Sequence, residues 1–198
     1  VREIGRSYAD VTPVARAREG QRPEDISAWS LDAKLENIFD VLTHPRLSFE
    51  YAFGSGDANR RLVTTTINGN APHTPDRNFL YFGYIDTGYV VSPRLSNLQM
   101  LRLGLALSPL EFTKRYKKSL ELGANYYNFH KHKKEGGISD FRANRNLGSL
   151  GEEIDVYANW KVVSDIFLNL NYGRFYPSNS YGDKSARDFF LVSVNFQF

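Results

Sequence analysis

Basic side chains at the polar positions of alternating segments are the residues of this chain with the clearest chemical use. Lys34, Arg102 and Lys161 each occupy a polar position in a segment where apolar and polar residues alternate. A row of fixed cations can replace the hydration of an anionic solute, provided that binding stays weak enough for release. This use favours Arg102 as the main contact, since Gly104 leaves room beside it. A second use stays open, namely cross-strand ion pairs that stiffen a sheet, with the partners Glu50, Glu121 and Asp155.

More positive charge lies between these segments. Arg94, Arg142 and Arg145 occupy stretches rich in Gly, Asn and Asp, a composition typical of loops. Such arginines would line a path for anions if their loop folds inward. They would contact lipopolysaccharide phosphates if it faces outward. Both hypotheses stay open for FRANRN, which holds Arg142 and Arg145, whereas HKHKKEGG at residues 130–137 favours the outward one.

The chain shows no pattern that predicts catalysis or metal binding. It has no cysteine, and no acid or third histidine stands at ligand spacing beside His130 and His132. No Ser-His-Asp arrangement is visible, and we expect the strand-start pair Glu152 and Glu153 to be solvated. GSGDAN at residues 54–59 lacks the Lys-Ser/Thr ending of a phosphate-binding loop and is predicted as a turn. We therefore expect no enzyme activity, no metal and no cofactor.

Seven segments would position the polar residues by strict two-residue alternation. Within each segment one set of alternate residues is apolar and the other is mostly polar. Alternation with this period predicts a β-strand that has one apolar face. The segments are AWSLDAKLEN (28–37), RLSFEYAFG (46–54), MLRLGLALS (100–108), SLELGANYYNF (119–129), EEIDVYANWKV (152–162), DIFLNLNYGRF (165–175) and RDFFLVSVNFQF (187–198).

Both a soluble β-sandwich and a membrane β-barrel alternate in this way. The charged face favours the barrel, because it would make a poor dry core. Large aromatic residues also lie toward the ends of the apolar face, as at the two interfaces of a bilayer; they are Trp29, Phe53, Tyr126, Trp160, Tyr172 and Phe198. We predict an all-β, antiparallel up-and-down barrel that spans an outer membrane with residues 26–198.

The connections between the segments are alternately short and long, which is typical of barrels with short periplasmic turns and long extracellular loops. The short ones are 40–45, 109–117 and 162–165, and the long ones are 55–96, 131–150 and 176–188. Segment 79–91, within the first long connection, is left as a strand extension, a small hairpin or a plug-like loop. Counting it as a spanning strand would break the alternation.

The strand count bears on how complete the barrel is. Seven antiparallel strands cannot close with both ends on one side, and bacterial barrels have even strand numbers. Residues 1–25 are therefore predicted as an extracellular loop that contains part of a further strand near Asp10–Arg18, or the chain is part of a larger barrel. Small residues such as Gly104 and Gly123 on the polar face leave lumen space and favour the larger barrel.

The charge balance, with 25 basic and 22 acidic residues, argues against a nucleic-acid partner.

Several stretches resemble the alginate-export family of Gram-negative outer-membrane barrels. They are RLSFEYAFGSGDAN, DTGYVVSPRLSNLQMLRLGLALSP, GSLGEEIDVYANWKVVSDIFLNLNYGRFYPSN and FLVSVNFQF, which together extend over residues 26–198. The resemblance implies the C-terminal part of a barrel of about 18 strands. It also implies passive, electrostatically guided passage of an anionic polysaccharide or a related solute through an arginine-lined lumen. Phe198 is then similar to the terminal signal that the outer-membrane assembly machinery reads.

One property of the polar face departs from that expectation. The polar positions of the seven segments carry more acidic than basic residues, so this part of the wall is not a simple electropositive surface. An alternative function therefore stays open, in which a structural barrel encloses a partner protein or docks a periplasmic partner and leaves no free pore.

Overall fold

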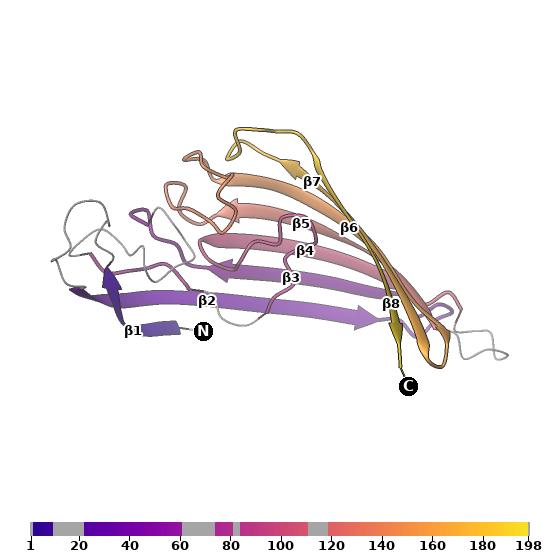
Figure 1. Cartoon of the computed structure of the whole chain (residues 1–198). Helices are drawn as coiled ribbons and strands as arrows, with labels where there is room; N and C mark the ends of the chain where they lie inside the picture. Colours follow the sequence, from indigo (N-terminus) through magenta and orange to yellow (C-terminus); the bar gives the residue numbers. More distant parts are fainter. Residues whose placement is uncertain (1, 10–21, 61–73, 81–83, 111–118, 198) are drawn as a thin grey trace.

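The computed structural model describes residues 2–9, 22–60, 74–80, 84–110 and 119–197. Eight strands form one antiparallel sheet, in which each strand pairs with its neighbours in the sequence (Figure 1). They are β1 (Arg2–Ala9), β2 (Arg22–Ile38), β3 (Arg46–Gly54), β4 (Leu98–Leu107), β5 (Leu120–Lys131), β6 (Ser149–Val163), β7 (Ile166–Pro177) and β8 (Arg187–Phe196). The predicted all-β, up-and-down order is confirmed. Within the described residues the sheet is not closed, since β1 and β8 each pair with one strand.

The seven predicted segments correspond to β2–β8, and β1 is the additional strand. β1 precedes the range Asp10–Arg18, which lies outside the described residues, as do residue 198 and residues 111–118 of one short connection. Strand β2 is long because its first part pairs with β1 and its last part, from Ser30, pairs with β3. In the described part of the chain we find no helix with the length and apolar character needed to cross a membrane.

One face of the sheet, here called the outer face, is apolar from β2 to β8. Register explains this: Phe49 of β3 lies between Leu35 of β2 and Leu103 of β4, and Tyr172 of β7 pairs with Phe190 of β8. Leu103 is 45% exposed, so it lies on the surface as the alternation predicted. The other large exposed residues of this face include Leu31, Leu47, Leu105, Leu107, Leu122, Ile154, Val156, Leu170, Val192, Val194 and Phe196.

Phe53 departs from the predicted pattern. It is in register with the outer-face residue Leu31, yet it is buried. The ring of Trp29 lies 4.3 Å from the ring of Phe53, and the imidazole of His132 lies 5.0 Å away, measured between ring centres. The long loop after β5 therefore covers an aromatic residue that we predicted at the exposed rim.

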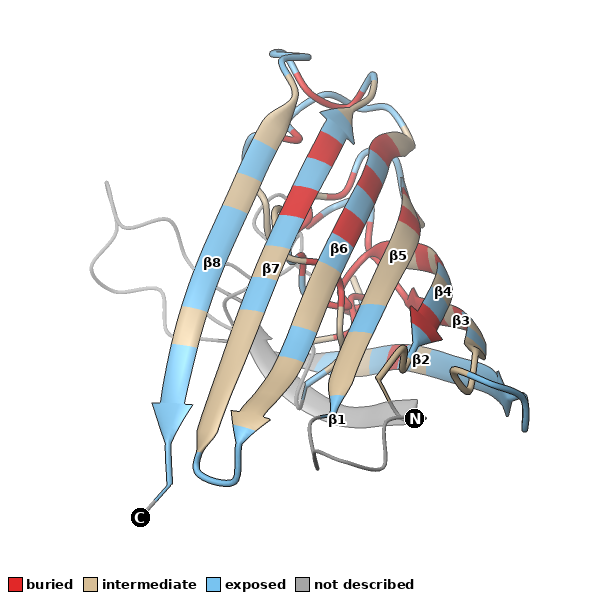
Figure 2. Cartoon of the chain, turned by 90° about the vertical axis from the view of Figure 1, so that its right-hand side faces the viewer, coloured by how far each residue is buried: buried red, intermediate tan, exposed pale blue. Residues whose placement is uncertain are grey.

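The opposite face, here called the inner face, is covered at one end by the two long loops that follow β3 and β5. Figure 2 shows buried residues gathering at this end of the curved sheet. Strand residues such as Met100 and Phe129 pack there with loop residues such as Phe79, Leu95 and Ile138. The rest of this core consists of Ala28, Ala52, Leu98, Tyr127, Ala143, Leu150, Phe175 and Tyr181. The remainder of the inner face lies toward the short connections.

Asn97, in the motif RLSNLQ, joins the two long loops. Its side-chain Nδ2 donates hydrogen bonds to the carbonyls of Lys133 and Gly137, both at 3.0 Å. Its Oδ1 accepts one from the backbone N–H of Lys133 at 2.7 Å. The residue is fully buried and has a φ of 53°, a left-handed conformation that asparagine tolerates better than most residues. The motif thus has a structural role at the base of the loops.

Candidate functional site

Residues 84–91, here called the inner loop, lie against the inner face and are held there by two carboxylates of β6. Glu153 accepts hydrogen bonds from the backbone N–H groups of Val90 at 2.7 Å and Val91 at 3.2 Å. Asp155 accepts one from the N–H of Tyr89 at 3.0 Å. Both carboxylates are fully buried under the loop. Three bonds to ionisable oxygens therefore define where the loop crosses the sheet.

This arrangement bears on the three alternatives for segment 79–91, of which residues 79–80 and 84–91 are described. These described residues contain no strand, and residues 84–91 form a loop that packs against the inner face, which matches the plug-like alternative. Gly88 is required at its turn, because its φ is 88° and a Cβ would collide with the carboxylate of Glu153. Burial, together with the nearby carboxylates of Asp155 and Asp86, raises the pKa of Tyr89 to about 12.

The expectation that Glu152 and Glu153 are both solvated is wrong for Glu153. Glu152 is exposed, but Glu153 lies on the inner face in line with Asp155 and is covered by the inner loop. The alternation placed Glu153 on the correct face. What it could not reveal was a loop that covers this part of the face.

Arg102 lies at the contact between the inner loop and the strands. Its guanidinium forms ion pairs with Glu50 of β3 and with Asp86 of the inner loop, the latter at 2.7 Å. The hydroxyl of Tyr127 donates a hydrogen bond to the same Asp86 oxygen at 3.1 Å. Arg102 and Glu50 are both buried. They lie on neighbouring strands and form a cross-strand ion pair, as the sequence predicted. Asp86 adds a partner from outside the strands.

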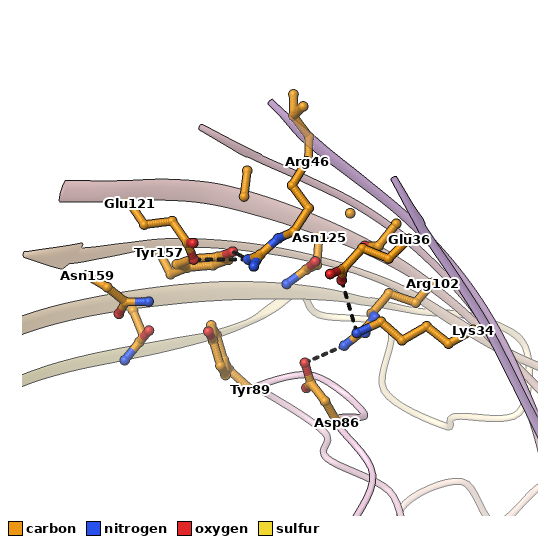
Figure 3. A pocket seen from close by; sticks show the side chains of 15 residues that line it. Lys34, Glu36, Arg46, Asp86, Tyr89, Arg102, Glu121, Asn125, Tyr157 and Asn159 are labelled. Carbon is orange, nitrogen blue, oxygen red and sulfur yellow. Dashed lines mark hydrogen bonds and ion pairs between the residues drawn. The ribbon is translucent and has the colours of Figure 1, made fainter. Parts of the chain in front are cut away.

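Toward the short connections the inner face forms a polar pocket of about 300 Å³ (Figure 3). Arg46 Nη2 lies 3.1 Å from Glu121 Oε1 and donates to the hydroxyl of Tyr157 at 3.3 Å. Lys34 Nζ lies 3.2 Å from Glu36 Oε2. The other lining residues include Ser48, Asp86, Tyr89, Arg102, Gly104, Asn125, Asn159 and Asn171.

The structure brings two of the predicted strand cations together. Lys34 and Arg102 line the same pocket. Lys161 is not among the lining residues, and its ammonium lies 5.2 Å from the centre of the Phe167 ring. The predicted ladder is therefore partial: Arg102 pairs with Glu50, whereas Lys34 pairs along its own strand with Glu36.

The three predicted loop arginines are exposed. The backbone N–H of Arg94 donates to Ser139 Oγ at 2.8 Å, and that of Arg145 donates to the carbonyl of Ser180 at 3.1 Å. These bonds hold the loop backbones. Neither Arg94 nor Arg145, nor Arg142, is among the residues that line the pocket.

The sequence analysis did not identify three residues of this site, namely Arg46 on β3 and Asp86 and Tyr89 in the inner loop. Arg46 had a signal, because it extends the alternation of β3 by one step before Ser48 and Glu50. Asp86 and Tyr89 had none, because a loop residue has no periodicity that assigns it to a face. Among the described residues, no group of three or more His, Cys, Asp or Glu could hold a metal ion.

The fold and the site define an all-β, up-and-down sheet protein whose apolar outer face backs a charged inner face crossed by a loop. A family model described as alginate export matches residues 11–190. The chain belongs to the alginate-export family, as the sequence motifs predicted. No curated protein sequence matches the chain.

Proposed function

We propose that this chain is the C-terminal part of an outer-membrane β-barrel channel that passes a polysaccharide or a related solute along its inner face. The family points to alginate, an anionic polysaccharide, as the first solute to test. The observation that carries the proposal is the outer face, where large apolar side chains of β2–β8 lie exposed in one continuous register. So wide an apolar surface suits contact with lipid acyl chains.

Two further features support the proposal. The sheet has open edges at β1 and β8 within the described residues, and unpaired edges suit a sheet that further strands complete. The long connections all lie at one end of the strands and the short ones at the other, as in outer-membrane barrels (Figure 1).

Conductance tests this function. The full-length protein, reconstituted in a planar bilayer, should produce discrete current steps that a polyuronate interrupts. Lys34→Glu reverses an exposed pocket charge and should shift the reversal potential toward cation preference, whereas Lys134→Glu, in an outer loop, should not. A protein that inserts and folds but passes no current would contradict the proposal.

A scaffold barrel without a free pore is the second candidate, favoured by the apolar core that covers one end of the inner face. Insertion without conductance, together with a partner protected inside the barrel, would support it. Under either function, we propose that Arg142 and Arg145 contact lipopolysaccharide phosphates, and the exposure of both side chains supports this. Docking of a periplasmic partner and the role of Phe198 in assembly stay predictions.

A further inference from the structure

We infer that the pocket on the inner face binds the hydroxyl groups and ring faces of a sugar chain and does not depend on its carboxylates. The inference rests on the proposed function and names the solute class, which is glycans, uncharged as well as anionic. Three properties of the pocket lead to it: its charges are compensated, its amides have no hydrogen-bond partner among the described residues, and aromatic and aliphatic side chains continue its wall toward β8.

The cations of the pocket already have carboxylate partners. Lys34 lies 3.2 Å from Glu36, and Arg46 lies 3.1 Å from Glu121. Arg102 is buried between two carboxylates. The lining thus holds three cations and three carboxylates, which sum to zero. A uronate entering here would have to displace an internal partner and leave it without its cation, so this wall gives carboxylates little advantage.

Uncharged polar groups between these pairs are available to a solute. Asn125, Asn159 and Asn171 line the pocket, and within the described residues no hydrogen bond ties their side-chain amides to other protein groups. An amide offers two donors and an acceptor, and a sugar hydroxyl both donates and accepts. The hydroxyl of Tyr157, which accepts from Arg46, lies in the same lining. These amides and the tyrosine hydroxyl can hydrogen-bond sugar hydroxyl groups whether the sugar is charged or uncharged.

Apolar rings continue the pocket wall toward β8. Tyr89, at the pocket, lies 6.1 Å from Phe189 of β8, measured between ring centres. Leu191 pairs with Asn171 across the two strands and is 46% exposed, although it lies on the inner face. The exposed Leu191 and the partly buried rings of Tyr89 and Phe189 provide apolar surface on an otherwise polar wall. Such surface suits the C–H faces of sugar rings, which pack on aromatic and aliphatic side chains.

Current block by matched sugars tests the inference. Maltohexaose, which is uncharged, and hexamannuronate would each be added to single channels of the full-length protein in 0.1 M and 1 M KCl. We expect both to interrupt the current, with dissociation constants within about threefold of each other at 1 M, where charge is screened. The constant for maltohexaose should be nearly the same at both salt concentrations.

The variant is Asn159→Leu combined with Asn171→Leu, and its matched control is Asn144→Leu in an exposed loop. Loss of the amides should weaken block by both sugars about fivefold or more, which corresponds to about one hydrogen bond, while the control should leave block unchanged. If the double variant fails to insert, Asn159→Ala provides the same comparison with a smaller loss.

The contrary outcomes separate the inference from the function. Block by hexamannuronate alone, lost at 1 M KCl, would overturn the inference and leave the channel intact. Block that the amide variants do not weaken would do the same. Current that neither sugar interrupts would overturn both the inference and the proposed passage of a polysaccharide, and would leave only an ion channel. Absence of current would overturn the proposed function and the inference with it.

Discussion

Glu153 and Val90 stand 63 positions apart and are joined by a hydrogen bond of 2.7 Å from the Val90 N–H to the Glu153 carboxylate. This bond anchors the inner loop to β6. Because the carboxylate is fully buried, its removal leaves backbone donors without a partner.

We predict that Glu153→Ala releases the inner loop. The N–H groups of Val90 and Val91 lose their acceptors, which costs about 1–3 kcal/mol of local stability. Hydrogen exchange of these two amides should become at least about fivefold faster by the same figure, and chymotrypsin should cut more readily after Tyr89. Glu152→Ala, at the exposed neighbouring position, should change neither. Equal exchange rates in the two variants would contradict this account of the loop.

We predict that Arg102 and Glu50 are strongly coupled. Arg102→Ala leaves the buried Glu50 carboxylate without its cation, at a cost of about 3–5 kcal/mol in the free energy of unfolding. The double variant with Glu50→Ala should be more stable than the sum of the single losses predicts. Urea unfolding in detergent measures both quantities. Lys34→Ala, which breaks an exposed ion pair, should cost less than about 1 kcal/mol, and additive losses for the buried pair would refute the coupling.

We predict that Lys131 protects the loop after β5. Its ammonium is buried and donates to the carbonyls of Ala143 at 2.9 Å and Arg145 at 3.0 Å. Lys131→Met removes both bonds, so trypsin should cleave after Arg142 and Arg145 several times faster. Lys134→Met, at an exposed position of the same loop, serves as the control. An unchanged cleavage rate would show that other contacts hold the loop.

We predict that acid weakens the contact between Gly56 and His132. The Gly56 N–H donates to His132 Nδ1 at 3.0 Å, and this bond requires the unprotonated nitrogen. Burial, and then the charge of Lys133, lower the pKa of His132 below its ordinary 6.5. As the pH falls through 6.5, the unfolded state therefore binds a proton that the folded state does not, and stability decreases.

The protection factor of the Gly56 amide, measured between pH 7.5 and 5.5, reports this change. It should decrease toward the lower pH in the native protein. His132→Asn offers an amide oxygen near the position of Nδ1 and does not titrate, so its protection factor should be independent of pH. A native protein with constant protection would contradict the prediction.

Much of the sheet could be predicted because its information is local. The two-residue period of a strand assigns each side chain to a face, and this placed Leu103 outward and Arg102 inward before any contact was known. It also suggested Glu50, Glu121 and Asp155 as cross-strand partners of the basic residues, and the register places Glu50 opposite Arg102. The family motifs added membership of the alginate-export family, which alternation alone could not show.

The contacts of the loops could not be predicted in this way. Asp86 contacts Arg102, Asn97 joins two loops, and His132 covers Phe53. Asp86, Asn97 and His132 all lie outside the periodic segments. Each contact depends on the path that a loop takes through space. The local sequence of a loop is compatible with many such paths, so it does not predict the contact. Glu153 is an example, because the alternation assigned its side chain to the inner face but did not predict that a loop buries it.

The sequence by itself therefore determined the seven strands β2–β8 and the faces of their alternating residues, because backbone geometry imposes its period on neighbouring residues, and its motifs indicated the family. Only the tertiary structure decided that a loop crosses the inner face, that the cations of its pocket are paired and that, among the described residues, the pocket amides have no hydrogen-bond partner. These properties arise where distant segments meet, and there the cost of burying a charge or a backbone N–H selects the partner.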